Sequence, residues 1–155
     1  MKQILASIIF VIVFNNIKAQ TNYTPTGTWK WISAKDTIEV FLKTDQLYIG
    51  NQAVPIVIGF HKYVKNAKLI ENSLLKKNTN YINEQYSIVL FNQYSDFYKL
   101  SGSIKDITLN YTRTIILTKI NPTTMSVRLT SMEGRRKNGT ISAYTLPRNF
   151  TLTKQ

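Results

Sequence analysis

Apolar and polar residues alternate along most of the chain, which is typical of strands that bury one face. Ile38, Val40 and Leu42 share one face of a segment whose opposite face carries charge. The longest alternating run is 54–64, where Gly59 predicts a bulge or bend in the sheet. Strands are predicted at 28–32, 37–43, 47–49, 54–64, 86–91, 112–120, 125–132, 141–146 and 150–154.

The turns between these segments favour one compact β-domain. Asn121-Pro122-Thr123-Thr124 separates two of the strands and predicts a hairpin. The segment 67–77 fits a short helix and a strand equally well, and both alternatives stay open. About eight to ten strands at this spacing predict an all-β fold, a single antiparallel barrel or sandwich.

The first residues follow another pattern. Lys2 gives a positive start, an uncharged apolar run covers 4–14, and a polar stretch ends at Ala19. This is the layout of a secretory signal peptide, and the apolar run is shorter than the roughly 20 residues that cross a bilayer. We expect residues 1–19 to be cleaved and 20–155 to form a secreted or periplasmic β-barrel domain. The chain has no cysteine to carry a bacterial lipid anchor, so we expect none.

The composition narrows the possible chemistry. Cysteine is absent and there is one histidine, which argues against a disulfide scaffold, a thiol nucleophile and a multi-histidine metal site. We expect no metal and no cofactor. His61 lies between Phe60 and Lys62, and we expect it to be a half-exposed strand residue. The eight acidic residues are scattered, so we do not expect an enzyme unless His61 and two acids meet in one pocket.

Gly27-Thr28-Trp29 opens the first predicted strand. It resembles the Gly-x-Trp signature of lipocalins and the Gly-Thr-Trp of avidins. The resemblance implies a lipocalin-like barrel in which Gly27 and Trp29 close one end. It also implies that a basic side chain from the last strands packs on the tryptophan, for which the candidates are Arg128, Arg148 and Lys154.

A broader similarity extends over nearly all of residues 20–155. It rests on Thr26-Gly27-Thr28-Trp29-Lys30-Trp31, Phe41-Leu42-Lys43, the segment 58–66 and the segment 146–154. In these segments the chain is similar to a family of small secreted bacterial proteins of unassigned function. The similarity implies a secreted or periplasmic lipocalin-like domain and supplies no catalytic residues.

The first functional hypothesis is a non-enzymatic binding protein that holds a small apolar or amphipathic ligand inside the barrel. Such a site needs a cavity of about 300 Å³ or more. Aromatic side chains at strand positions are the candidates for its walls. The predicted ligand-binding residues are Trp31, Phe41, Tyr48 and Tyr63.

The alternative hypothesis starts from the formal net charge of +12. Removing residues 1–19 removes Lys2 and Lys18 and leaves 18 − 8 = +10. A solid barrel with basic loops would bind anionic envelope polymers, chiefly through Arg135, Arg136 and Lys137. Nucleic acid is not an expected partner of an exported protein. The same charge also fits an AT-rich codon bias with solvated lysines, and the oligomeric state stays open.

Overall fold

The computed structural model describes residues 25–92, 97–130 and 145–155. Within them the chain forms nine strands and two single-turn 3-10 helices. None of the helices in this described part is long and apolar enough to cross a membrane. The strands are β1 (Gly27–Ser33), β2 (Asp36–Ile49), β3 (Gln52–Lys65), β4 (Lys68–Asn72), β5 (Ile88–Asn92), β6 (Lys99–Asp106), β7 (Tyr111–Asn121), β8 (Thr124–Thr130) and β9 (Asn149–Lys154); the 3-10 helices are η2 (Leu74–Lys76) and η3 (Tyr81–Asn83).

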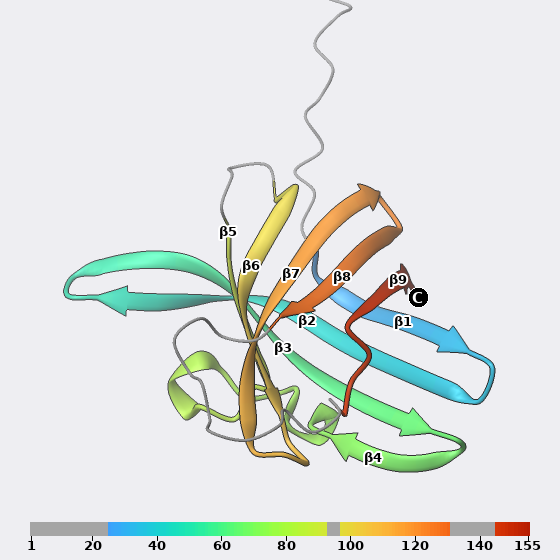
Figure 1. The fold of residues 1–155 in the computed structure, drawn as a ribbon. Helices are drawn as coiled ribbons and strands as arrows, with labels where there is room; N and C mark the ends of the chain where they lie inside the picture. The colour runs from blue at the N-terminus through green and yellow to red at the C-terminus, as the bar shows by residue number, and fades with distance from the viewer. Residues whose placement is uncertain (1–24, 93–96, 131–144) are drawn as a thin grey trace, which may run out of the picture.

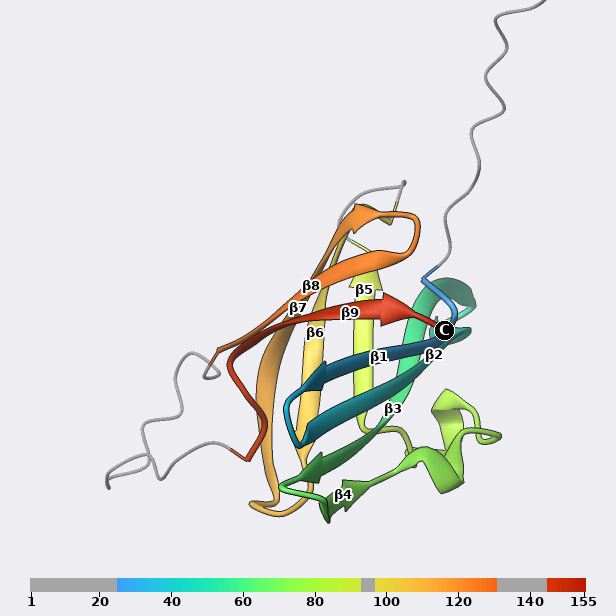
Figure 2. The same cartoon turned by 90° about the vertical axis from the view of Figure 1, so that its right-hand side faces the viewer.

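Eight of the strands close into a barrel, seen from two sides in Figures 1 and 2. The ring runs β1-β2-β3-β5-β6-β7-β8-β9 and closes by the pairing of β9 with β1. Every pairing is antiparallel, so the barrel has an up-and-down topology. β4 lies outside the ring and pairs with β3. The antiparallel barrel predicted from the sequence is therefore confirmed.

The strand boundaries differ from the predictions in several places. The segments 37–43 and 47–49 belong to one long strand, β2, which pairs with β3 far beyond its contact with β1. The ambiguous segment 67–77 contains both a strand and a 3-10 turn. β6 is not evident from the sequence, because Gly102 and Asp106 weaken its alternation. The strand predicted at 141–146 falls mostly outside the described residues.

The interior of the barrel is an apolar core built by the predicted alternation. Ile38, Val40 and Leu42 point inward from β2, and every other wall strand contributes buried side chains to the same cluster. The interior-facing leucines Leu90, Leu100 and Leu117 are almost completely removed from water.

The outer face of β3 is also covered. Residues 73–87, called the excursion below, connect β4 to β5 and carry both 3-10 turns. They fold over the wall formed by β2, β3 and β5, as Figure 2 shows. This cover explains why residues 86–91 are apolar on both faces. Leu90 points into the barrel, while Val89 packs beneath the excursion. The buried residues of this outer cluster are Ile56, Ile58 and Phe60.

Gly59 lies where β3 changes its neighbour. Residues 56–59 pair with β5 and residues 62–65 pair with β4. A Cβ on Gly59 would lie 2.7 Å from Cδ2 of Leu42 and 3.1 Å from Cβ of Ile88. The predicted bend is thus a point of close approach that leaves no room for a side chain.

Candidate functional site

The four predicted ligand-binding residues do not come together. Trp31 is half-buried inside the barrel with its ring centroid 5.7 Å from that of Phe150. Tyr63 is buried in the same core. Phe41 lies on the outer wall against the excursion. Tyr48 is 60% exposed near the tip of the β2–β3 hairpin.

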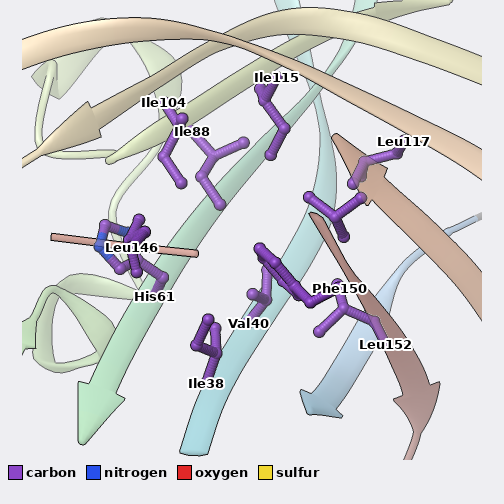
Figure 3. A pocket seen from close by; sticks show the side chains of 11 residues that line it. Ile38, Val40, His61, Ile88, Ile104, Ile115, Leu117, Leu146, Phe150 and Leu152 are labelled. Carbon is purple, nitrogen blue, oxygen red and sulfur yellow. The ribbon is translucent and has the colours of Figure 1, made fainter. Parts of the chain in front are cut away.

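The barrel interior is filled by side chains. Figure 3 shows the aliphatic side chains of several strands, with His61 and Phe150, pointing toward a common centre. The cavity that they leave has a volume of about 10 Å³. That space suits about one water molecule and is far below the roughly 300 Å³ that a small-ligand site needs. The interior therefore lacks the preformed cavity that the first hypothesis requires.

Trp29 lies near one end of the barrel, which is called the tryptophan end. β1 begins here and β9 ends here. Trp29 is fully buried, and its Nε1 donates a hydrogen bond of 2.8 Å to the carbonyl oxygen of Pro25. Nζ of Lys154 lies 5.6 Å from the ring centroid of Trp29, within cation–π range. Lys154, one of the three basic candidates, thus packs on this ring.

Gly27 is the first residue of β1, two positions before Trp29. Its φ of +111° is a backbone conformation that side chains rarely adopt. A Cβ on Gly27 would lie 3.5 Å from Cε of Lys154. The glycine thus lets the chain turn into β1 directly beside the lysine.

The opposite end holds a buried polar cluster and is called the histidine end. His61 is fully buried and faces the interior, so the expectation of a half-exposed strand histidine is wrong. Its Nδ1 lies 2.8 Å from Oγ of Ser87, and its Nε2 lies 2.7 Å from Oε2 of Glu71. Ser87 Oγ in turn lies 2.8 Å from Oγ of Ser73. All four side chains belong to buried residues.

Two further charged residues extend the cluster. Asp106 accepts a hydrogen bond of 2.9 Å from Nη2 of Arg113, and both side chains are buried. Burial by itself would raise the pKa of Glu71, but hydrogen bonds from His61, Asp106 and the Thr108 N–H lower it to about 2. Burial raises the pKa of Asp106 against the hydrogen bond from the Leu109 N–H, and nearby Glu71 raises it further. The pKa of Glu71 is therefore lowered and that of Asp106 is raised, so the two neighbouring carboxyl groups are shifted in opposite directions.

The cluster lies beside the start of β5, where β4 and β6 are not joined by backbone hydrogen bonds. Ser87, just before β5, still donates its N–H to the Gly59 carbonyl at 3.0 Å and accepts from the Lys105 N–H at 2.8 Å. On the other side of Ser87 the excursion leaves the wall, and β4 and β6 do not pair. Glu71 joins β4 to the turn between β6 and β7, because its Oε1 accepts a hydrogen bond of 3.1 Å from the Thr108 N–H. Side chains thus replace the missing ladder.

The same cluster contains the groups of a hydrolytic triad. Ser87, His61 and Glu71 are linked as a nucleophile, a base and an acid would be. The Ser87 residue is only 5% exposed, however, and its hydroxyl is already bonded to Ser73. The adjacent 10 Å³ cavity has no space for a substrate. The described residues contain no group of three or more histidine or acidic side chains that could hold a metal ion.

The sequence neighbours of these residues do not indicate the cluster. One feature of the sequence does point to it, namely the position of two charged residues in the strand alternation. Arg113 is in phase with Ile115 and Leu117 on the buried face of β7. Asp106 is likewise in phase with Ile104 on β6. A charge at a buried position needs a buried partner. The inward-facing positions of Arg113 and Asp106 thus indicate that each charge has a buried partner, but they do not identify that partner.

Two groups of basic residues bear on the alternative hypothesis. Arg135, Arg136 and Lys137 lie outside the described residues. Lys35, in the turn before β2, is exposed, and so is each lysine that flanks the β3–β4 turn. The Ala67 N–H donates a hydrogen bond of 3.3 Å to the Lys35 carbonyl, which joins the two turns. The lysines of this group are Lys35, Lys65 and Lys68.

The fold and its two ends define a small up-and-down β-barrel protein with a filled interior, one aromatic end and one ionic end. The chain belongs to a family of unknown function, DUF6705, whose profile matches residues 1–155. No curated protein and no solved structure matches it. Its function is therefore argued from the geometry.

Proposed function

We propose that this protein is an exported, non-enzymatic binding protein that uses its outer surface to bind anionic envelope polymers such as polysaccharide. The filled interior supports an outer rather than an internal site, because the cavity of about 10 Å³ has no space for a ligand. The signal-like segment at 1–19 supports export.

The observation that carries this proposal is the basic surface at the histidine end. Lys35, Lys65 and Lys68 are brought together there by the joined turns. Within the described part of the chain, the salt bridges involve His61, Glu71, Arg113 and Asp106 and none of these lysines.

Asp36 is the acid nearest to these turns in the sequence. Its carboxylate accepts a hydrogen bond of 2.9 Å from the Asn66 N–H and one of 3.4 Å from the Tyr63 hydroxyl. Asp36 therefore holds the turns in place without forming a salt bridge to a lysine. The lysine charges stay available to a polymer, which would bind with salt-dependent affinity.

Arg135, Arg136 and Lys137 belong to the segment 131–144, which lies outside the described residues. It connects Thr130, the last residue of β8, to Thr145, the first described residue before β9. Both flanking residues belong to the histidine end, where β8 ends and β9 begins. We propose that this segment adds its charge to that of the three lysines.

Binding to an immobilised sulfated polysaccharide, measured at several salt concentrations, tests this function. The test variant is Lys35→Gln/Lys65→Gln/Lys68→Gln. The control variant, Lys30→Gln/Lys99→Gln/Lys119→Gln, loses the same charge on β1, β6 and β7. If each lysine near the anionic polymer contributes about 1 kcal/mol, the test variant loses roughly 100-fold in affinity. We expect the affinity of the control variant to fall by less than about tenfold.

Equal losses in the two variants would mean that net charge alone governs binding, and the proposed surface would be wrong. Failure of the unmodified protein to bind at low salt would overturn the function itself. A small apolar molecule retained through purification at a 1:1 ratio, found by mass spectrometry, would instead support an interior that opens.

A further inference from the structure

The excursion presents two aliphatic side chains to water. Leu75 in η2 is 88% exposed and Ile82 in η3 is 73% exposed. They are the two most exposed large hydrophobic side chains of the described residues. The neighbouring Leu74 and Tyr81 point the other way and pack on the outer cluster. Each 3-10 turn thus has one side chain anchored on the barrel and one directed away from it.

Lysines accompany these exposed side chains. Lys76 and Lys77 follow Leu75 directly, and both are exposed. Nζ of Lys77 lies 5.8 Å from the ring centroid of Phe41. Nζ of Lys43 donates a hydrogen bond to the carbonyl oxygen of Thr79 within the excursion. The acid of the excursion, Glu84, forms no salt bridge in the described part of the chain. The surface is therefore apolar and cationic together.

The excursion is held firmly, so these side chains are presented in fixed positions. The rings of Tyr81 and Tyr86 stack with centroids 5.1 Å apart and an interplanar angle of 11°. The Tyr81 N–H donates a hydrogen bond of 2.7 Å to Oδ2 of Asp45 on β2. The Ser73 N–H donates one of 2.8 Å to the His61 carbonyl. Little ordering is needed when this surface meets a partner.

We propose that the excursion binds the surface of an anionic lipid bilayer, with Leu75 and Ile82 inserted among the lipids and Lys76 and Lys77 at the phosphates. Binding at a membrane interface combines burial of apolar area with attraction of cations to anionic lipids, and this surface offers both. Lipid headgroups of negative charge complement the lysines, and the acyl region accepts the aliphatic groups. This inference does not rest on the polymer-binding function, to which the aliphatic side chains would contribute nothing.

Vesicle sedimentation tests the proposal with phosphatidylcholine vesicles that contain or lack 30 mol% phosphatidylglycerol. The variants are Leu75→Ser/Ile82→Ser and Lys76→Gln/Lys77→Gln. The control, Ile32→Ser/Ile120→Ser, removes side chains that are 65% and 59% exposed on β1 and β7. All variants keep the same N-terminal residues, so differences between them report on the excursion.

We expect the aliphatic variant to lose at least tenfold in affinity for the anionic vesicles and the control to stay within twofold. The lysine variant should lose the preference for anionic over neutral vesicles. Unchanged binding by Leu75→Ser/Ile82→Ser, or no binding by the unmodified protein, would overturn the proposal. All of these substitutions lie on the surface, where changes in stability are small, and thermal unfolding checks this.

A depth measurement gives an independent result. The chain has no cysteine, so Leu75→Cys provides a single site for an environment-sensitive fluorophore. Its emission should shift to the blue on adding anionic vesicles, while a label at Ile120→Cys should not shift. A second copy of the chain as the true partner would give a dimer without vesicles that Leu75→Ser/Ile82→Ser dissociates, and that result would refute the lipid contact.

Discussion

At the tryptophan end a buried indole ring packs beneath Lys154, whereas at the histidine end polar side chains from four strands form a buried cluster. His61, Glu71, Asp106 and Arg113 come from β3, β4, β6 and β7 respectively. The aromatic end depends on packing and one hydrogen bond. The ionic cluster depends on every partner and on pH, because a buried charge without its partner is costly. The two ends should therefore respond differently to mutation and acid.

The largest effect is expected from breaking the ion pair at the histidine end. Arg113→Met leaves two neighbouring buried carboxyl groups, Asp106 and Glu71, without the guanidinium. Removing one partner of a buried pair costs about 3–5 kcal/mol, so the free energy of unfolding in urea should fall by that amount.

The double variant Arg113→Met/Asp106→Leu should recover part of the loss, since replacing both partners by apolar groups is tolerated better. A loss below about 1 kcal/mol in Arg113→Met would show that the ion pair does not hold this end of the barrel.

Acid should distinguish the two ends. The folded-state pKa of Glu71 is about 2, below its ordinary value of 4.5. Its stabilising contribution, on the order of 3 kcal/mol, is present above the ordinary pKa and is lost as the pH falls toward 2. Asp106, whose pKa is raised, favours the folded state when protonated and offsets part of this loss. The free energy of unfolding should therefore decrease between pH 4.5 and 2.

Glu71→Gln should flatten the pH dependence in that window, because the amide does not titrate. The comparison is with Trp29→Phe, which should leave the slope unchanged. A parallel slope in Glu71→Gln and the unmodified protein would assign the acid sensitivity to other carboxyl groups.

The aromatic end should lose less from a conservative change. Trp29→Phe removes the donor to the Pro25 carbonyl, which stays buried. Leaving a buried acceptor without its partner costs about 1–3 kcal/mol, and the cost should be the same at pH 3 and pH 7. Trp31→Phe is the matched control, since Trp31 is only half-buried, and it should cost less. A cost that varies with pH would link the two ends.

The two ends also differ in how far the sequence predicts them. Gly27 and Trp29 are neighbours in the chain, so a short motif indicates the aromatic end, and the alternation predicts the barrel around it. His61 and Asp106 are 45 positions apart in the sequence, and both interact with Glu71 on a third strand, β4. Such a contact depends on the register of several strands, which alternation alone leaves open. The fold class was therefore predictable and the ionic cluster was not.

The exposed side of the excursion was hidden from the sequence for a related reason. Leu74 and Leu75 are adjacent and chemically identical, yet one packs on the barrel and the other is 88% exposed. Only the geometry of the 3-10 turn and the outer cluster separates them. The filled interior could not be predicted for a similar reason. The alternation specifies which side chains point inward, but not how completely they fill the space.

The smallest expected effect belongs to Lys154, which contacts Trp29 from the outside. Lys154→Met keeps much of the aliphatic cover on the ring and removes the charge. A cation–π contact at an exposed site contributes about 0.5–1 kcal/mol, and Lys154 is exposed. The free energy of unfolding should fall by about that amount at low salt and hardly change with pH between 3 and 8. A larger loss in Lys154→Met than in Trp29→Phe would mean that the lysine, rather than the buried indole, stabilises this end.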